Sequence, residues 1–392
     1  MSVRTDPNLR LLFAALLLWM LGVGLYEQLI PIYARQELGA TPVQLGTLFT
    51  LRNLALAAGF LIGWMLADRF SRRTVILVSW IAGVPVPLML AAAPSYLWLL
   101  PGLLLYELTY FGLPAIHAYI TQRVPPSELA SAFGTMGTVT SMGFLVSPTL
   151  GGFIADRWGI RTVLVIAFVL FCLSSVLILR LQHGGPGTMP AAQPRSLSWD
   201  HLRPLAPAIW IYTGVVFMVQ ITVPYVTPFL REARGLSLSE IGFLGSTQAV
   251  GAVLLTPIVG RLGDRLGLLS TLAGQLVIFS SGMLMTVYGP AALLPLMAAL
   301  RCRAPLNALG QAFIGARAPA AMVGRAFALG GILSAALSAA GVFVGGFAYR
   351  IHPAYPILIS VGSAAALALA LAWLRPGGAP APDTDAAGPT QG

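Results

Sequence analysis

The feature that most constrains the fold is a series of long apolar runs, separated by short polar, glycine-containing or proline-containing breaks. A helix of about 20 apolar residues crosses the roughly 30 Å hydrocarbon core of a membrane. We place such runs at residues 10–34, 43–67, 74–93, 96–120, 129–155, 160–182, 205–230, 238–262, 268–288, 291–314, 322–349 and 353–374. The chain is therefore predicted to be an all-α membrane protein with twelve transmembrane helices.

Composition supports lipid as the solvent for most of this chain. Of its 392 residues 57% are hydrophobic and only 9% are charged, whereas about a quarter of the residues in soluble domains are charged. The mean hydropathy is +0.82. The net charge of +10 comes from arginines scattered singly between apolar runs, so it does not indicate nucleic-acid binding.

The two cysteines and the N-terminus exclude some further features. Cys172 and Cys302 both lie inside apolar runs, which offers neither a disulfide framework nor a CxxC metal site. The first apolar run is too long for a signal peptide and lacks a small-x-small cleavage site. We expect it to be retained as the first span.

Arginine placement predicts the orientation, because cytoplasmic loops of membrane proteins are enriched in basic residues. With the N-terminus inside, the inner segments hold the larger set, which is Arg4, Arg10, Arg69, Arg72, Arg73, Arg123, Arg180, Arg195, Arg203, Arg261, Arg265, Arg317, Arg325 and Arg375. The outer segments hold Arg35, Arg157, Arg161, Arg231, Arg234 and Arg350. A multi-pass protein of the inner (plasma) membrane with both termini cytoplasmic is expected.

The two halves of the chain repeat one another. The stretch from Gly46 to Asp68 matches Gly242 to Asp264 at an offset of 196 residues, and the two GGF triplets, 151–153 and 345–347, are offset by 194. We therefore expect an N-terminal six-helix bundle at 1–182, a cytoplasmic linker at 183–204, a C-terminal six-helix bundle at 205–375 and a disordered tail at 376–392. Parallel duplication of this kind is typical of transporters whose binding site lies between the halves.

At this point the chain resembles the major facilitator superfamily over essentially its whole length. The loop after the second span has Asp68, Arg69, Arg72 and Arg73 in the family's G-x-x-x-D-R-x-G-R-R pattern, with Ser71 replacing the second glycine. The second half keeps Gly260, Asp264 and Arg265 but lacks the arginine doublet. The fifth span is similar to the family's antiporter pattern, in which Gly143, Pro148, Gly151 and Gly152 match. The resemblance implies the major facilitator fold, two pseudo-symmetric bundles of six helices, and drug/proton antiport.

A gating role is expected for these loop residues. A carboxylate at Asp68 can meet the positive N-terminal end of the eleventh span, and Asp264 can meet the start of the fifth span near Glu128. Contacts that form only when the cytoplasmic side is closed would bias a two-state equilibrium. The alternative is that the arginines only anchor the topology.

Five charged residues lie at membrane depth, where charge is costly and usually faces a cavity or a partner. Glu27 and Arg52 lie at similar depth and could pair, while Glu107 and Arg301 are related by the repeat and could face one central cavity. Arg303 is expected on nearly the opposite helix face, since two residues turn a helix by roughly 200°.

Other polar side chains in the spans are candidates for lining the cavity. Tyr110 and His117 form one stripe with Glu107 and Pro114 at helical spacing. The remaining candidates offer hydrogen bonds or aromatic surface, and they are Tyr26, Gln220, Tyr225, Gln248, Asn307 and Gln311.

Glu27 or Glu107 is the candidate proton carrier, because a desolvated carboxyl can load a proton on one side and release it on the other. The alternative is a permanent ion pair, Glu27–Arg52 or Glu107–Arg301, that never titrates. The pattern thus favours a secondary transporter that exports a small, largely apolar or cationic molecule in exchange for protons, by alternating access and as a single chain. A proton-coupled importer or a facilitator of a small organic anion, with Arg52 or Arg301 binding the carboxylate, is the alternative.

Enzymatic function is not expected. The sequence has no GxSxG, HExxH or phosphate-binding Gly-Lys-Ser/Thr motif, so neither hydrolytic chemistry nor ATP drive is indicated. No cofactor and no metal are expected. The predicted partners are a small-molecule substrate, protons and membrane lipid.

Overall fold

The computed structural model describes residues 6–67, 70–182, 205–317 and 323–373. Within these ranges the chain is helical and contains no strand. The first group of helices is α1 (Pro7–Tyr26), α2 (Ile30–Ile32), α3 (Pro42–Ala67), α4 (Arg72–Gly83), α5 (Val86–Ala91), α6 (Leu99–Leu108), α7 (Leu113–Arg123), α8 (Leu129–Trp158) and α9 (Ile160–Leu179). The second group is α11 (Ala206–Gln220), α12 (Val226–Glu232), α13 (Leu238–Leu266), α14 (Leu268–Tyr288), α15 (Leu294–Leu300), α16 (Ala304–Arg317), α17 (Val323–Ile351) and α18 (Tyr355–Trp373).

The prediction of an all-α membrane protein is confirmed. Among the described residues, 9 helical segments are long and apolar enough to cross a membrane. The other three predicted spans, at 205–230, 291–314 and 353–374, fall on shorter or interrupted helices, so the count of twelve stays a prediction. The proposed linker at 183–204 and the whole of the proposed tail at 376–392 lie outside the described residues.

Several predicted spans are interrupted rather than continuous. The fourth span passes from α6 through a 3₁₀ segment, Thr109–Gly112, into α7, which has Pro114 in its first turn. The tenth span breaks between α15 and α16, at residues 301–303. Proline removes a backbone donor and clashes with the preceding turn, and Pro114 and Pro305 each follow such a break. Interrupted backbone inside a membrane occurs where it lines a cavity or is buried in protein.

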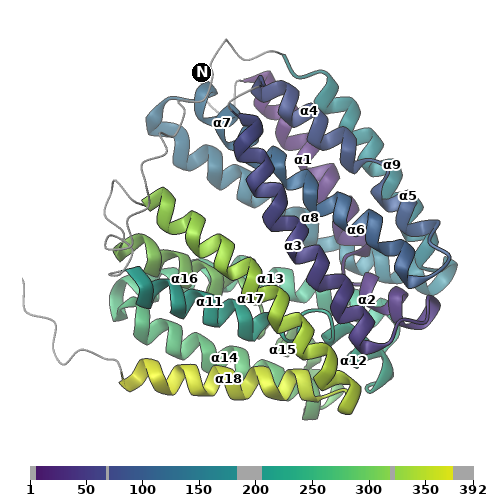
Figure 1. The fold of residues 1–392 in the computed structure, drawn as a ribbon, viewed down its shortest axis with the longest axis vertical. Helices are drawn as coiled ribbons and strands as arrows, with labels where there is room; N and C mark the ends of the chain where they lie inside the picture. Colours follow the sequence, from purple (N-terminus) through teal and green to yellow (C-terminus); the bar gives the residue numbers. More distant parts are fainter. Residues whose placement is uncertain (1–5, 68–69, 183–204, 318–322, 374–392) are drawn as a thin grey trace, which may run out of the picture.

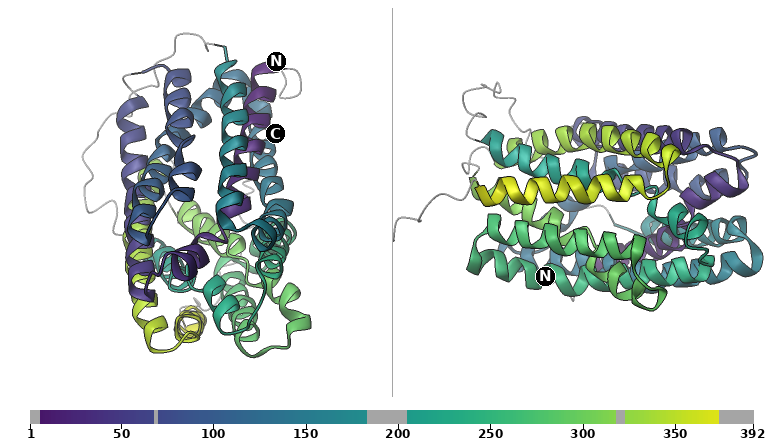
Figure 2. Two further views of the ribbon diagram at one scale, coloured as in Figure 1. Left: turned by 90° about the vertical axis from the view of Figure 1, so that its right-hand side faces the viewer. Right: turned by 90° about the horizontal axis from the view of Figure 1, so that it is seen from below.

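The two groups of helices pack against each other along two antiparallel pairs (Figure 1). Helix α8 of the first group runs along α13 of the second, and α3 runs along α17. Seen from below, the helices run roughly parallel to one another (Figure 2). Large apolar side chains such as Val146, Phe153, Leu254 and Phe347 are exposed on the outer sides of these helices, as expected for surfaces that meet lipid.

The α8–α13 pair is in close contact at one end and apart at the other. A Cβ added at Gly152 would overlap the Leu238 carbonyl and lie 3.1 Å from the Cα of Gly242. About five turns away along each helix, a Cβ added at Gly134 or Gly260 would meet no described atom within 4 Å. The two groups therefore diverge from a closed face, where α8 ends and α13 begins, toward an open face, where α8 begins and α13 ends.

Asp6 fixes the beginning of α1 at the open face. Its carboxylate accepts hydrogen bonds from the backbone N–H groups of Asn8 at 2.8 Å and Leu9 at 3.4 Å, and it pairs with Arg123 at the end of α7 at 3.2 Å. Burial alone would raise the pKa of Asp6, but these hydrogen bonds and the Arg123 charge outweigh it, so the pKa lies below its usual value. The carboxylate thus both caps α1 and ties it to α7.

We expect the Asp6→Ala variant to lower the free energy of unfolding by about 1–2 kcal/mol, through loss of the cap and its charged partner. Because the folded-state pKa of Asp6 is lowered, its contribution is complete above the unfolded pKa near 4 and disappears as the pH falls through the folded pKa. Thermal unfolding in detergent at pH 7 and at pH 3 measures this. A wild-type advantage that is as large at pH 3 as at pH 7 would contradict the assignment.

Candidate functional site

A central cavity of about 520 Å³ lies between the two groups of helices. Its polar wall is formed by Glu27, Gln28, Arg52, Tyr106, Tyr110, Thr140, Ser141, Thr222, Thr227, Gln248, Arg301 and Arg303. Its apolar wall includes Phe49, Phe144, Val219, Val223, Val226, Phe279 and Met283. A largely apolar cavity of this size with a few convergent polar groups is typical of a small-molecule site.

Arg52 on α3 joins two carboxylates at the wall of this cavity. Its Nη1 lies 2.8 Å from Oε1 of Glu27, just after α1, and its Nε lies 2.5 Å from Oε1 of Glu107 on α6. The Glu107 and Arg52 side chains are 6% and 13% exposed, whereas that of Glu27 is 30% exposed. We call these three residues the Arg52 triad; it holds Glu107 out of solvent and leaves Glu27 accessible from the cavity.

The structure contains one of the two ion pairs that the sequence suggested, the first from equal depth and the second from the internal repeat. The Glu27–Arg52 pair is present, whereas the Glu107–Arg301 pair is wrong, because Glu107 is bonded to Arg52. Positions related by the repeat are equivalent in their own bundles, and this does not bring them into contact. Arg301 nevertheless lies in the cavity wall, as expected, and is only 6% exposed.

The expectation for Arg303 was also wrong. Arg301 and Arg303 both line the central cavity instead of occupying opposite faces of one helix. The helical period does not extend across the break between α15 and α16, so residues two apart can face the same space. The Cys302-Arg303-Ala304-Pro305 sequence is the signal that could have revealed this break.

The remaining predicted cavity residues divide into two sets. Tyr110 and Gln248 line the cavity, whereas the others are not among its lining residues, namely Tyr26, His117, Gln220, Tyr225, Asn307 and Gln311. Tyr26 is 2% exposed, and fully buried Tyr225 donates its hydroxyl to the Val342 carbonyl at 2.9 Å, so both are packing residues.

The predicted stripe from Glu107 to His117 is broken by the 3₁₀ segment between α6 and α7. A 3₁₀ turn advances three residues per turn instead of 3.6, which rotates everything after it. His117 is consequently exposed and packs its ring edge-on against Phe133 at 5.4 Å, away from the cavity.

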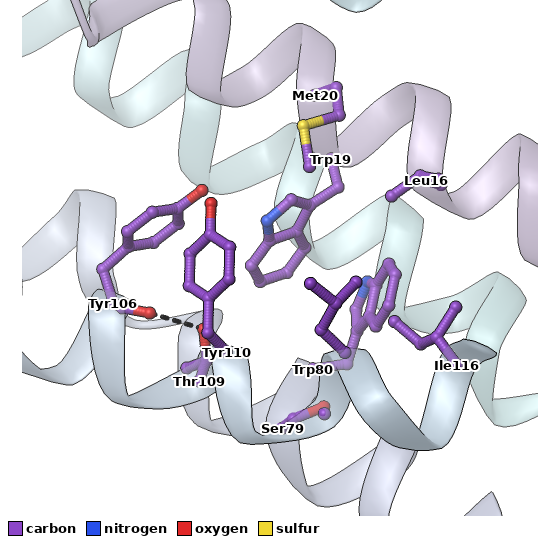
Figure 3. A pocket seen from close by; sticks show the side chains of 11 residues that line it. Leu16, Trp19, Met20, Ser79, Trp80, Tyr106, Thr109, Tyr110 and Ile116 are labelled. Atoms are coloured by element: carbon purple, nitrogen blue, oxygen red, sulfur yellow. Dashed lines mark hydrogen bonds between the residues drawn. The ribbon is translucent and has the colours of Figure 1, made fainter. Parts of the chain in front are cut away.

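A small aromatic pocket of about 70 Å³ adjoins the central cavity behind Tyr106 and Tyr110, which line both (Figure 3). The two tyrosine rings meet edge-to-face at 6.0 Å, and Trp19 packs against Trp80 at 5.2 Å. The pocket holds a few small groups at most, so we interpret it as packing that holds the tyrosine wall in place.

The arginine-rich loop is only partly described. Asp68 and Arg69 lie outside the described residues. Arg73 donates to the carbonyls of Leu181 at 2.5 Å and Leu179 at 3.3 Å, which caps the end of α9. Gly260, Asp264 and Arg265 are exposed at the open face, so the gating roles stay predictions.

The fifth-span motif forms a packing surface. A Cβ at Gly143 would lie 2.5 Å from Cβ of Met20, and one at Gly151 would overlap the Leu25 carbonyl, so both glycines let α8 approach α1. Gly152 and the Pro148 carbonyl meet α13 in the same way. The motif therefore fixes α8 between α1 and α13.

A polar network that sequence analysis missed holds the closed face together. Arg35 donates two hydrogen bonds to the Glu232 carboxylate, at 2.8 and 3.0 Å, and Tyr349 donates to the same carboxylate at 2.8 Å. Asp156, at the end of α8, accepts from the backbone N–H groups of Leu238 at 3.0 Å and Ser239 at 2.7 Å, at the beginning of α13. For Asp156 the signal was the Asp-Arg pair at 156–157, which resembles the pairs at 68–69 and 264–265.

Two packed groups of membrane helices, closed at one face around a charged central cavity, define a transporter that moves a small-molecule substrate rather than an enzyme. The family model described as the Major Facilitator Superfamily matches residues 11–219 and 208–391. The chain belongs to the major facilitator superfamily and is a multi-pass membrane protein.

Named relatives include bacterial drug-resistance proteins. The chain is 32% identical over 260 residues to the multidrug resistance protein MdtG of Klebsiella pneumoniae, an alignment that covers 61% of each chain. It is 28% identical over 306 residues to MdtG of Proteus mirabilis, with 73% of each chain covered. It is 25% identical to the multi-drug resistance efflux pump PmrA of Streptococcus pneumoniae, with 68% of this chain and 69% of the relative covered.

Solved structures share the fold at low sequence identity. The nucleoside transporter NupG has a TM-score of 0.74 at 15% identity, covering 94% of this chain and 99% of the other. The peptide transporter POT in complex with sulfate has a TM-score of 0.77 at 14% identity, covering 93% and 94%.

We expect the Arg52→Gln variant to lower the free energy of unfolding by about 3–5 kcal/mol, because it leaves the buried Glu107 carboxylate without its partner. The double variant Arg52→Gln/Glu107→Gln should recover at least half of that loss. Thermal unfolding of both variants in detergent measures the effect, and equal stability of the single and double variants would contradict it.

Proposed function

We propose that the chain is a proton-coupled efflux transporter for small, largely apolar compounds, working by alternating access. The observation that carries the proposal is a mainly apolar cavity, closed at one face and open at the other, with an accessible carboxylate in its wall. The printed names of the MdtG and PmrA relatives, which describe multidrug resistance and efflux, support the same class of activity.

The proposal includes two six-helix bundles, at 1–182 and 205–375, that act in a single chain. We place both termini in the cytoplasm and the protein in the inner membrane, because the larger set of arginines belongs to the segments of the open face. The open face is then the cytoplasmic one, and substrate enters the cavity from that side.

Glu27 is the better candidate for the proton carrier. Its side chain is 30% exposed and lines the cavity, whereas that of Glu107 is 6% exposed and does not line it. Protonation of Glu27 would remove one of the two negative charges on Arg52 and leave the Arg52–Glu107 pair intact. A proton taken up at Glu27 is therefore able to change the charge of the cavity without disrupting the buried pair.

The proton role has a direct test in proteoliposomes that carry an imposed pH gradient and N-phenyl-1-naphthylamine, a neutral apolar dye. We expect Glu27→Gln to reduce gradient-driven dye efflux by about tenfold or more, because the group that exchanges the proton is lost. Glu107→Gln should retain a measurable pH dependence, and Glu37→Gln, a carboxylate outside the cavity, serves as the matched control.

Three outcomes would count against this reading. If Glu27→Gln leaves the pH dependence unchanged, the proton assignment is wrong. If the wild-type protein moves no dye in either direction, efflux itself is wrong. Dye movement only toward the side of the open face would favour the importer or facilitator alternative.

Alternating access requires the closed face to open while Asp264 approaches the beginning of α8 at the other face. We expect Asp156→Ala, which removes the contacts to α13, to shift the population toward closure of the open face. Asp156→Asn keeps an acceptor for the helix end and should shift it less.

Spin labels at the exposed positions Gln122 on α7 and Ala316 on α16 span the open face and report the shift as a shorter distance by electron–electron double resonance. Identical distance distributions for Asp156→Ala and wild type would show that the α8–α13 contact does not set the equilibrium.

A further inference from the structure

The central cavity contains more positive than negative charge. Arg52, Arg301 and Arg303 contribute three positive charges to its wall, and Glu27 contributes one negative charge. Glu107 does not line the cavity, but it is bonded to Arg52 and adds a second negative charge beside the wall. If all five are ionised, one positive charge remains uncompensated. Because the effective dielectric constant of such a cavity is low, the uncompensated charge interacts much more strongly with a bound ion there than at a water-exposed surface.

The excess can be assigned to one residue. Both carboxylates are bonded to Arg52, so the Arg52 triad carries a surplus negative charge. Arg303 is exposed and lines the same cavity as Glu27, so its charge offsets that surplus. Among the described arginines that line the cavity, Arg301 is the buried one, and it makes no ion pair.

Arg301 is also left without polar contacts. Its residue is 6% exposed and lines the cavity, and no ion pair or side-chain hydrogen bond to another described residue is present for it. A second cavity-lining group on the same set of helices, the Thr227 hydroxyl, is fully buried and has no hydrogen-bond partner among the described residues. Buried polar groups are normally paired, and a buried arginine without a partner is costly.

We propose that Arg301 is the binding site for an acid group, and that the substrates of this transporter are amphipathic organic anions with an apolar body. This inference rests on the proposed function and names its substrate class. The acid head pairs with the Arg301 guanidinium, which can donate two parallel hydrogen bonds to a carboxylate. The apolar body lies against Val219, Val223, Phe279 and Met283, which belong to the same set of helices as Arg301.

This assignment distinguishes between the two arginines that the sequence offered as possible carboxylate-binding residues. Arg52 and Arg301 were both possible partners for a carboxylate, but Arg52 already holds two carboxylates. A cationic substrate would enter a cavity whose uncompensated charge has the same sign. The cavity therefore favours apolar anions over apolar cations.

The test uses three probes that share one naphthalene body: 2-naphthylacetate, 2-(2-naphthyl)ethanol and 2-(2-naphthyl)ethylamine. Isothermal titration calorimetry on the purified full chain in detergent gives their affinities. We expect the acid to bind at least about tenfold more tightly than the amine. Arg301 attracts the carboxylate through charge-assisted hydrogen bonds and repels the ammonium group. Arg301→Gln should weaken acid binding by about tenfold or more and change alcohol binding by less than about twofold.

Arg303→Gln is the matched control, because it removes the same charge from the same cavity. It should weaken acid binding by no more than about threefold, since Arg303 is exposed and water screens its charge. Arg301→Lys keeps the positive charge but loses the guanidinium that donates two parallel hydrogen bonds. Its affinity for the acid should lie between those of the wild type and Arg301→Gln. Arg301→Gln should unfold at the same temperature as wild type or higher, whereas a merely structural arginine would lower that temperature.

The proposal is overturned if the amine binds as tightly as the acid, if Arg303→Gln and Arg301→Gln act equally, or if none of the three probes binds. Efflux of N-phenyl-1-naphthylamine is measured separately on the same preparation. If the dye is still exported when any of these results is found, the acid site is rejected and the proposed efflux function stands. If acid binding depends on Arg301 but no dye is exported, the acid site stands and the proposed efflux function is rejected.

Discussion

The close backbone approach of α8 and α13 at the closed face is the constraint on which the rest of the structure depends. Gly152 and Gly242 let the two helices come within van der Waals contact of their backbones. Without a hydrophobic driving force between helices in lipid, small residues of this kind supply the packing that holds two bundles together. The central cavity has room between the two groups because this contact occurs at one end of α8 and α13 only.

The charged residues at membrane depth differ between the two groups of helices. In the first group of helices these charges are paired in the Arg52 triad, and of its two carboxylates only Glu27 is accessible from the cavity. The second group presents arginines from an interrupted helix. A proton-exchanging side and a substrate-attracting side would thus face each other across one cavity, so that occupancy of either alters the field felt by the other.

Sequence reasoning succeeded where local patterns determine the outcome. Apolar run length predicted the helical segments that are long enough to cross a membrane. Counting residues from a common surface placed Glu27 at the depth of Arg52, and the two side chains do pair. It failed where the helical period was interrupted: His117 is rotated away by the Thr109–Gly112 turn, and Arg303 is brought beside Arg301 by the break that follows α15. The Arg35–Glu232 pair joins residues far apart in the chain, and only the packing of the two groups could reveal it.

Helices α8 and α13 can each act as a lever. The contacting glycines, Gly152 and Gly242, lie about five turns from Gly134 and Gly260 at the open end of the same helices. With a rise of about 1.5 Å per residue, the arm measures about 27 Å, so a tilt of about 10° at the glycine contact displaces the far end by roughly 5 Å. A displacement of that size is comparable with the width of a naphthalene ring. If access alternates as proposed, passage of a flat solute needs only a small change in the tilt of rigid helices, and no helix has to unwind.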